Sequence, residues 1–141
     1  MPNRENPLLL DTHAWLWLVS GAEPLKRSVL STVERGARQG RIRVSAISVW
    51  EVAMLEAKGR IRLSKDCLAW VHDALASPGI SLVPLTPEIA VESCRLPGTF
   101  HGDPADRILV ATARLLGATL LTRDTGILAY GKGNRVSTMA V

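Results

Sequence analysis

The sequence predicts an α/β fold in which a mainly parallel, five-stranded sheet is covered by helices on both faces. Five short apolar runs alternate along the chain with longer segments of helical periodicity. Strands joined through helices lie parallel, because each crossover returns the chain to the same edge of the sheet. A length of 141 residues fits one domain. We therefore expect a single domain over residues 1–141, with residues 1–6 as a flexible N-terminal tail.

Proline, glycine and capping residues divide the first half of the chain into elements. Pro24 suits the first turn of a helix, and Gly21 and Gly40 directly follow helical segments. Ser48 and Glu51 have the spacing of a capping box, so we expect a helix to begin there. The predicted elements are a strand over 8–10, a helix that is capped by Asp11 or Thr12 and ends before Gly21, a helix over 25–39, a strand over 42–45, a helix over 48–59, and a helix over 65–76 capped by Ser64.

The second half follows the same signals. Pro84 cannot donate a hydrogen bond within a sheet, so its strand belongs at an edge. Thr86 before Pro87, and Asp103 before Pro104, each combine a cap with a proline at the first helical position. The predicted elements are a strand over 80–85, a helix from 87 to about 96, a helix over 104–116, a strand over 118–122, a helical turn over 127–130, and a strand over 136–139.

Composition narrows the function classes. Four Trp, one Tyr and one Phe are too few aromatics to predict a stacking platform for single-stranded nucleic acid. Cys67 and Cys94 lie in apolar helical patterns without metal-ligand spacing, which predicts buried free thiols. The longest apolar run, residues 8–19, contains Asp11 and is too short to cross a bilayer. We therefore expect a cytoplasmic protein with no membrane partner.

Basic residues gather in one part of the chain. Ten of the 17 Lys and Arg residues lie between Lys26 and Lys65, where only three residues are acidic. This excess is typical of a solvated helix surface and equally of a surface that faces a polyanion. The sequence leaves both interpretations open.

Five carboxylates fall where the predicted topology brings them together. Asp11 and Asp124 follow strands, while Glu51, Asp103 and Asp106 lie in the first turns of helices that start at the same sheet edge. Each could cap a helix, but five converging carboxylates exceed what capping needs. Like charges at close range destabilise a fold unless a cation offsets them. Oxygen ligands without paired His or Cys favour Mg²⁺ or Mn²⁺ over Zn²⁺, so the pattern predicts a magnesium or manganese site.

Four stretches of the chain resemble a known family. They read, in order, Leu-Leu-Leu-Asp-Thr-His-Ala-Trp-Leu (8–16), Ser-Ala-Ile-Ser-Val-Trp-Glu (45–51), His-Gly-Asp-Pro-Ala-Asp-Arg (101–107) and Leu-Thr-Arg-Asp (121–124). Together they resemble the motifs of PIN-domain ribonucleases, and most of all those of the VapC-type toxins of toxin–antitoxin modules. No single motif is specific for this family. The order and spacing of all four motifs, in a resemblance that runs from about residue 7 to residue 141, are specific for it.

The resemblance implies a function for each carboxylate. Asp11, Glu51, Asp106 and Asp124 would bind Mg²⁺ or Mn²⁺ and act as the catalytic residues; Asp103 would be an accessory ligand or a helix cap. Thr122, which matches the family's small hydroxyl beside the last Asp, would orient a carboxylate or a water. The resemblance further implies the sheet order 3-2-1-4-5, endonucleolytic cleavage of RNA by metal-activated water, homodimerisation, and neutralisation by a small antitoxin protein.

Two positions depart from the subfamily's pattern. Gly102 stands where a basic residue is usual, and Ala105 stands where an aromatic is usual. Both departures concern substrate contacts near the loop rather than the metal site.

Three further interpretations accompany the resemblance. The helical segments over 24–76 combine apolar faces with many arginines, which suits a groove for an antitoxin tail. The chain could instead be a non-catalytic RNA- or protein-binding module that uses the pocket structurally. A haloacid dehalogenase-like phosphatase is disfavoured, because that family requires a second Asp two residues after the first and position 13 is His.

Overall fold

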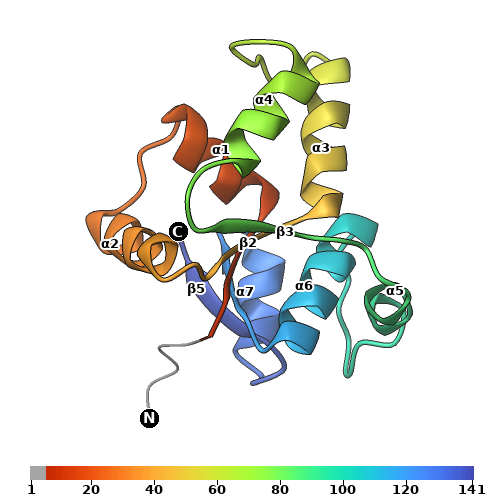
Figure 1. Cartoon of the computed structure of the whole chain (residues 1–141). Helices are drawn as coiled ribbons and strands as arrows, with labels where there is room; N and C mark the ends of the chain where they lie inside the picture. Colours follow the sequence, from red (N-terminus) through yellow and green to blue (C-terminus); the bar gives the residue numbers. More distant parts are fainter. Residues whose placement is uncertain (1–5) are drawn as a thin grey trace.

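A five-stranded, fully parallel sheet runs through the centre of the computed structural model, which describes residues 6–141 (Figure 1). The strands are β1 (Leu8–Leu10), β2 (Ile42–Ser45), β3 (Ile80–Val83), β4 (Thr119–Thr122) and β5 (Ser137–Ala140). Their order is β3-β2-β1-β4-β5, and every neighbouring pair is parallel. The predicted fold class and strand order are confirmed.

Seven helices connect the strands of this described part and cover both faces of the sheet. They are α1 (Thr12–Ser20), α2 (Arg27–Arg38), α3 (Ala46–Ala57), α4 (Cys67–Leu75), α5 (Pro87–Ser93), α6 (Pro104–Leu116) and α7 (Thr125–Gly131). Buried residues of α1, α2 and α4 share one hydrophobic core, which also takes in Val52 of α3. Buried residues of α5, α6 and α7 form the other. Leu8 and Leu10 enter the first core and Leu9 enters the second, as expected for a strand buried on both faces.

The register of β1 and β4 decides where the carboxylates emerge. Leu10 pairs with Leu121, and the backbone N–H of Asp11 donates to the Leu121 carbonyl at 3.0 Å. The residues that follow these two central strands therefore leave the sheet side by side at its carboxyl edge. Open α/β sheets bind ligands at this edge, beside the strand where the order changes direction.

The capping box predicted at Ser48 and Glu51 is wrong. Helix α3 begins at Ala46, and the Ser45 hydroxyl caps it by accepting from the N–H of Ile47 at 3.1 Å. Ser48 is therefore inside the helix and fully buried, and Glu51 lies in its second turn. The earlier start has a physical cause: Ser45 is the last residue of β2, so the chain turns into the helix without a loop.

Other element boundaries also differ from the sequence prediction. Helix α4 begins at Cys67 and is capped by Asp66 rather than Ser64. Helix α2 begins at Arg27 instead of residue 25, and α5 ends at Ser93, before the predicted residue 96. Strand β3 ends at Val83, so Pro84 lies just beyond it; the strand is at an edge of the sheet, as its proline requires.

The cysteines differ from the prediction as well. Cys67 and Cys94 are free thiols, but Cys67 is only half-buried at the first position of α4, and Cys94 is exposed at the end of α5. Of the predicted flexible tail, residues 1–5 lie outside the described residues. The backbone carbonyl of Asn6 accepts a hydrogen bond from Arg41 at 2.6 Å. No helix within residues 6–141 is long and apolar enough to cross a membrane.

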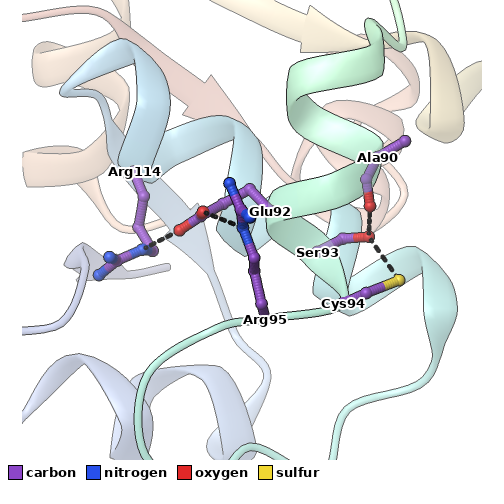
Figure 2. A network of polar contacts seen from close by, with 6 residues as sticks. All are labelled: Ala90, Glu92, Ser93, Cys94, Arg95 and Arg114. Carbon is purple, nitrogen blue, oxygen red and sulfur yellow. Dashed lines mark hydrogen bonds and ion pairs between the residues drawn. The ribbon is translucent and has the colours of Figure 1, made fainter.

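Polar contacts fasten α5 to α6 and so fix the loop that leads to Asp103. Glu92 of α5 accepts from Arg114 of α6 at 3.2 Å and lies 3.9 Å from Arg95 (Figure 2). In the same view, the Ser93 hydroxyl donates to the Ala90 carbonyl at 2.6 Å. Near the start of α6, Arg107 donates from Nε to the Ser93 carbonyl at 2.8 Å and from a terminal nitrogen to the Phe100 carbonyl at 2.7 Å. Arg107 thus holds both ends of the α5–α6 loop.

Candidate metal centre

All five predicted carboxylates line one cavity of about 270 Å³ at the carboxyl edge of the sheet. We refer to this cavity as the acidic pocket. Its carboxylates come from the ends of β1 and β4, from the middle of α3 and from the start of α6. The residues that line it are Asp11, Thr12, His13, Trp17, Glu51, Asp103, Asp106, Leu109, Arg123 and Asp124.

Asp11 is the most buried of the five carboxylates, with 8% of its surface exposed. One oxygen caps α1 by accepting from the Ala14 N–H at 2.8 Å, and the other accepts from the buried hydroxyl of Thr122. Burial raises the pKa of the Asp11 carboxyl, and the hydrogen bond from Thr122 offsets part of that rise. Thr122 therefore supports Asp11, in addition to accepting from the backbone N–H of Asp124 at 3.0 Å.

Glu51 is supported in a similar way from α1. The hydroxyl of Thr12 donates to Oε1 of Glu51 at 2.5 Å and is also hydrogen-bonded to the Ser48 hydroxyl at 2.9 Å. Burial raises the pKa of Glu51, the bond from Thr12 lowers it, and the negative charge of Asp103 raises it again. The packing of α1 on α3 thus fixes where the Glu51 carboxylate lies.

The remaining three carboxylates depend on helix starts. Asp103 caps α6 through the N–H of Asp106, and Asp124 caps α7 through the N–H of Ile127, each at 2.8 Å. Burial and the charges of Asp103, Asp124 and Glu51 together raise the pKa of Asp106 to about 7. No side chain within residues 6–141 donates a hydrogen bond to Asp106. A backbone hydrogen bond from Asp103 lowers the pKa of Asp106 only in part, so the protein itself compensates the ionised form poorly.

The donor set of the acidic pocket fits a divalent cation of the Mg²⁺ or Mn²⁺ type. Its candidate ligands are carboxylate oxygens, and the capping bonds of Asp103 and Asp124 each use only one oxygen. Within residues 6–141, no three His, Cys, Asp or Glu side chains are arranged to hold an ion as they stand. Burial and the neighbouring negative charges raise the pKa of Asp106, and a bound cation would offset both effects.

Sequence reasoning missed several neighbours of these carboxylates. Thr12 supports Glu51 directly, and Ser48, which resembled a helix cap in the sequence, is hydrogen-bonded to Thr12. Arg123 lines the acidic pocket with its guanidinium carbon 4.2 Å from the centre of the Trp17 ring. Its Nε donates to the Val141 carbonyl at 2.9 Å. Arg123 could have been identified by its place between Thr122 and Asp124, one residue beyond β4.

A larger, mostly apolar groove adjoins the acidic pocket. Its volume is about 800 Å³, and it lies between α1, α4 and the connecting residues 61–65. His13 and Trp17 line both cavities, so the groove leads to the carboxylates. Trp70 and Lys65 line its far part. Of the region predicted to form a groove, residues 24–76, only the part from residue 61 onward lines this one, and α1 with the residues that follow it forms the other wall.

Comparison with known proteins agrees with this architecture. The sequence profile of the PIN domain matches residues 8–133. The chain is 33% identical to Ribonuclease VapC22 of Mycobacterium tuberculosis over 117 residues, which are 83% of this chain and 86% of that protein.

Two solved structures share the fold. VapBC2 from Rickettsia felis, bound to a DNA fragment from their promoter, matches with a TM-score of 0.68 and 14% identity over 94% of this chain and 97% of the other. FitAcB from Neisseria gonorrhoeae matches with a TM-score of 0.62 and 22% identity, covering 94% of this chain and 96% of the other.

Proposed function

Because this chain belongs to the PIN domain family and has a VapC ribonuclease as a relative over most of its length, we propose that it is an endoribonuclease, dependent on Mg²⁺ or Mn²⁺, and the toxin of a toxin–antitoxin pair. The observation that carries the proposal is the convergence of Asp11, Glu51, Asp106 and Asp124 on one pocket. Because the chain belongs to this family, the haloacid dehalogenase-like phosphatase is no longer an alternative.

In this proposal the carboxylates hold the metal ion, and two threonines position two of the carboxylates. Asp11, Glu51, Asp106 and Asp124 would hold the cation, with Asp103 as an accessory ligand. A bound Mg²⁺ or Mn²⁺ supplies a water of lowered pKa and offsets negative charge on the phosphate under attack. The hydroxyls of Thr122 and Thr12 hold Asp11 and Glu51 in place before any ligand arrives.

Charge outside the pocket supports a polyanionic substrate. The chain has 17 basic and 13 acidic residues, and five of the acidic ones line the acidic pocket. Arg123 brings a guanidinium to the pocket, where it can contact a phosphate next to the one being hydrolysed. Outside the five pocket carboxylates, basic residues of the chain clearly outnumber acidic ones, and this excess favours association with RNA.

The partner that we propose is a small antitoxin protein, whose tail would occupy the apolar groove between α1 and α4 and reach the acidic pocket past His13 and Trp17. A homodimer, in the cytoplasm, completes the proposal. Co-expression with the neighbouring reading frame, followed by native purification and light scattering, tests both parts. A strictly monomeric chain at high concentration that retains no partner would contradict them.

Cleavage is tested directly. The purified protein, freed of any antitoxin, is incubated with total RNA in Mg²⁺, in Mn²⁺ or in EDTA, beside an Asp11→Asn variant. We expect discrete cleavage products with either metal, none with EDTA, and none with the variant. RNA that stays intact with both metals, including tRNA and ribosomal RNA, would favour a non-catalytic binding module.

A further inference from the structure

A second cavity opens beside the acidic pocket and shares three of its carboxylates. It has a volume of about 580 Å³ and is lined on one side by Asp103, Asp106 and Asp124. The opposite side is formed by Phe100, Tyr130 and Arg135. We refer to it as the aromatic pocket. Whatever occupies it lies next to the group held at the acidic pocket.

The single phenylalanine and the single tyrosine of the chain meet in this cavity. Their ring centres are 4.9 Å apart with the planes tilted by 45°. The Tyr130 hydroxyl donates to the Pro97 carbonyl at 2.6 Å, and the Phe100 carbonyl accepts from Arg107. Both residues are therefore held in place, Tyr130 in the core and Phe100 half-buried at the cavity. The scarcity of aromatics argues against an extended stacking platform, but one positioned ring is enough for one base.

Gly102 makes room for the Phe100 ring. A Cβ atom at position 102 would lie 2.5 Å from two carbons of that ring, closer than any side chain could fit without moving it. The glycine stands where the resemblance leads one to expect a basic residue. A Cβ at position 102 would also lie 2.9 Å from the Cβ of Asp106, so Gly102 lets the Phe100 ring and Asp106 approach each other closely.

Arg135 brings positive charge to the same cavity. Its guanidinium carbon is 5.4 Å from the centre of the Tyr130 ring, within the range of a cation–π contact. A guanidinium can stack on a base or pair with a phosphate, whereas the carboxylates of the cavity repel a phosphate unless a cation lies between them. The aromatic pocket is also large enough for a nucleobase.

We infer that the aromatic pocket is a subsite for one RNA base adjacent to the scissile phosphate, with the base stacked on Phe100 and its phosphate near Arg135. This inference rests on the proposed ribonuclease function for its substrate. Stacking tolerates different bases, because each has an aromatic face. The subsite therefore senses chiefly whether a base is present at one position of the substrate.

The experiment compares a good single-stranded substrate with a set of copies, each lacking the base at one position. Binding is measured by fluorescence anisotropy in Ca²⁺, with the RNA verified intact on a gel, and cleavage is measured separately in Mg²⁺. The variants are Phe100→Leu, Phe100→Tyr and Gly102→Ala. Trp50→Leu is the matched control, because Trp50 is exposed on α3 and lines neither cavity.

For the wild type, we expect loss of the base at one position to weaken binding about tenfold. Phe100→Leu should weaken binding to intact RNA by the same factor and abolish the sensitivity to the missing base. Gly102→Ala should reduce the sensitivity to the missing base in part, by displacing the Phe100 ring. Phe100→Tyr and Trp50→Leu should retain that sensitivity. Thermal melting of each variant identifies any that fail to fold.

The outcomes separate this inference from the proposed function. RNA that is bound and cleaved, with the missing-base sensitivity unchanged in both Phe100→Leu and Gly102→Ala, would overturn the subsite alone. Binding that depends on Phe100 without cleavage in Mg²⁺ would uphold the subsite and contradict the ribonuclease. If the wild type does not bind RNA at all, both are wrong.

Discussion

The two sides of the acidic pocket hold their carboxylates by different means. On one side, Asp11 and Glu51 accept hydrogen bonds from the hydroxyls of Thr122 and Thr12. On the other side, Asp103 and Asp124 accept from backbone N–H groups at helix starts, and no side chain within residues 6–141 donates to Asp106. We refer to these as the hydroxyl side and the backbone side.

The difference shows which carboxylates the protein itself can compensate. Hydrogen bonds to a carboxylate stabilise its charged form and offset the cost of burial. We therefore expect the hydroxyl side to keep its geometry with or without a cation. On the backbone side, the neighbouring charges of Asp103, Asp124 and Glu51 add to the burial of Asp106 and raise its pKa to about 7. Asp106 is thus the carboxylate that depends most on a bound cation.

The largest expected effect follows from removing the Asp106 charge. Asp106→Asn should lower the cleavage rate about a hundredfold or more, because a metal ligand is lost. The metal-free protein should be no less stable, or more stable, since repulsion is relieved. Asp103→Asn is the matched control: Asn caps a helix as well as Asp does, so activity should stay within about tenfold. Cleavage rates and melting temperatures in EDTA test this. If Asp103→Asn lost more activity than Asp106→Asn, Asp103 would be the metal ligand and Asp106 would act mainly on the helix start.

The same imbalance predicts a pH dependence of stability without metal. The raised pKa of Asp106 means that the folded state binds more protons than the unfolded state between about pH 4 and about pH 7. The free energy of unfolding in EDTA should therefore fall as the pH rises through this window. Asp106→Asn should flatten the curve, and saturating Mg²⁺ should counteract the fall. Urea unfolding at several pH values measures it; an equal slope in the wild type and the variant would contradict the assignment.

A third test removes the support on the hydroxyl side. Thr122→Val keeps the shape of a fully buried side chain but leaves Asp11 without its hydroxyl donor. Losing a partner of a buried charged group costs about 1–3 kcal/mol in the free energy of unfolding. Thr122→Ser retains the hydroxyl and should recover most of that loss. Chemical denaturation compares the variants. Equal stabilities for Val and Ser would show that the hydroxyl contributes little.

The smallest effect is expected for Thr12→Val. Glu51 is less buried than Asp11, so its carboxylate can gain water in place of the Thr12 hydroxyl. We expect a loss of about 1 kcal/mol in the free energy of unfolding and a modest loss of metal affinity, about tenfold. Ser48→Ala, which removes the other hydroxyl of the pair, provides the comparison. A destabilisation larger than that of Thr122→Val would mean that the support of Glu51 outweighs that of Asp11.

The sequence was sufficient for the carboxylates because topology alone places them. Asp11 and Asp124 follow strands, and Asp103 precedes a proline that starts a helix, so local patterns and one rule about parallel sheets bring them to one edge. The hydroxyl support of Glu51 depends instead on how α1 packs on α3, which local patterns do not encode. The capping box failed for a related reason: Ser45 and Ser48 are both good caps, and only the length of β2 selects Ser45.

The aromatic pocket was beyond sequence reasoning for a similar reason. Phe100 and Tyr130 are isolated in the sequence and share no pattern, and they meet only because α7 packs beside the loop that Arg107 holds. Gly102 drew attention as a departure from the subfamily's pattern, but its effect on the Phe100 ring depends on distances in three dimensions.

Three carboxylates of the acidic pocket also cap helices: Asp11, Asp103 and Asp124. This second function affects which substitutions the chain can accept during evolution. A descendant that no longer needed nuclease activity would still need these three aspartates to begin α1, α6 and α7. The presence of these three aspartates in a related protein is therefore weak evidence that it is catalytic. Position 106 is more informative, because its charge opposes the fold and selection for stability alone would discard it.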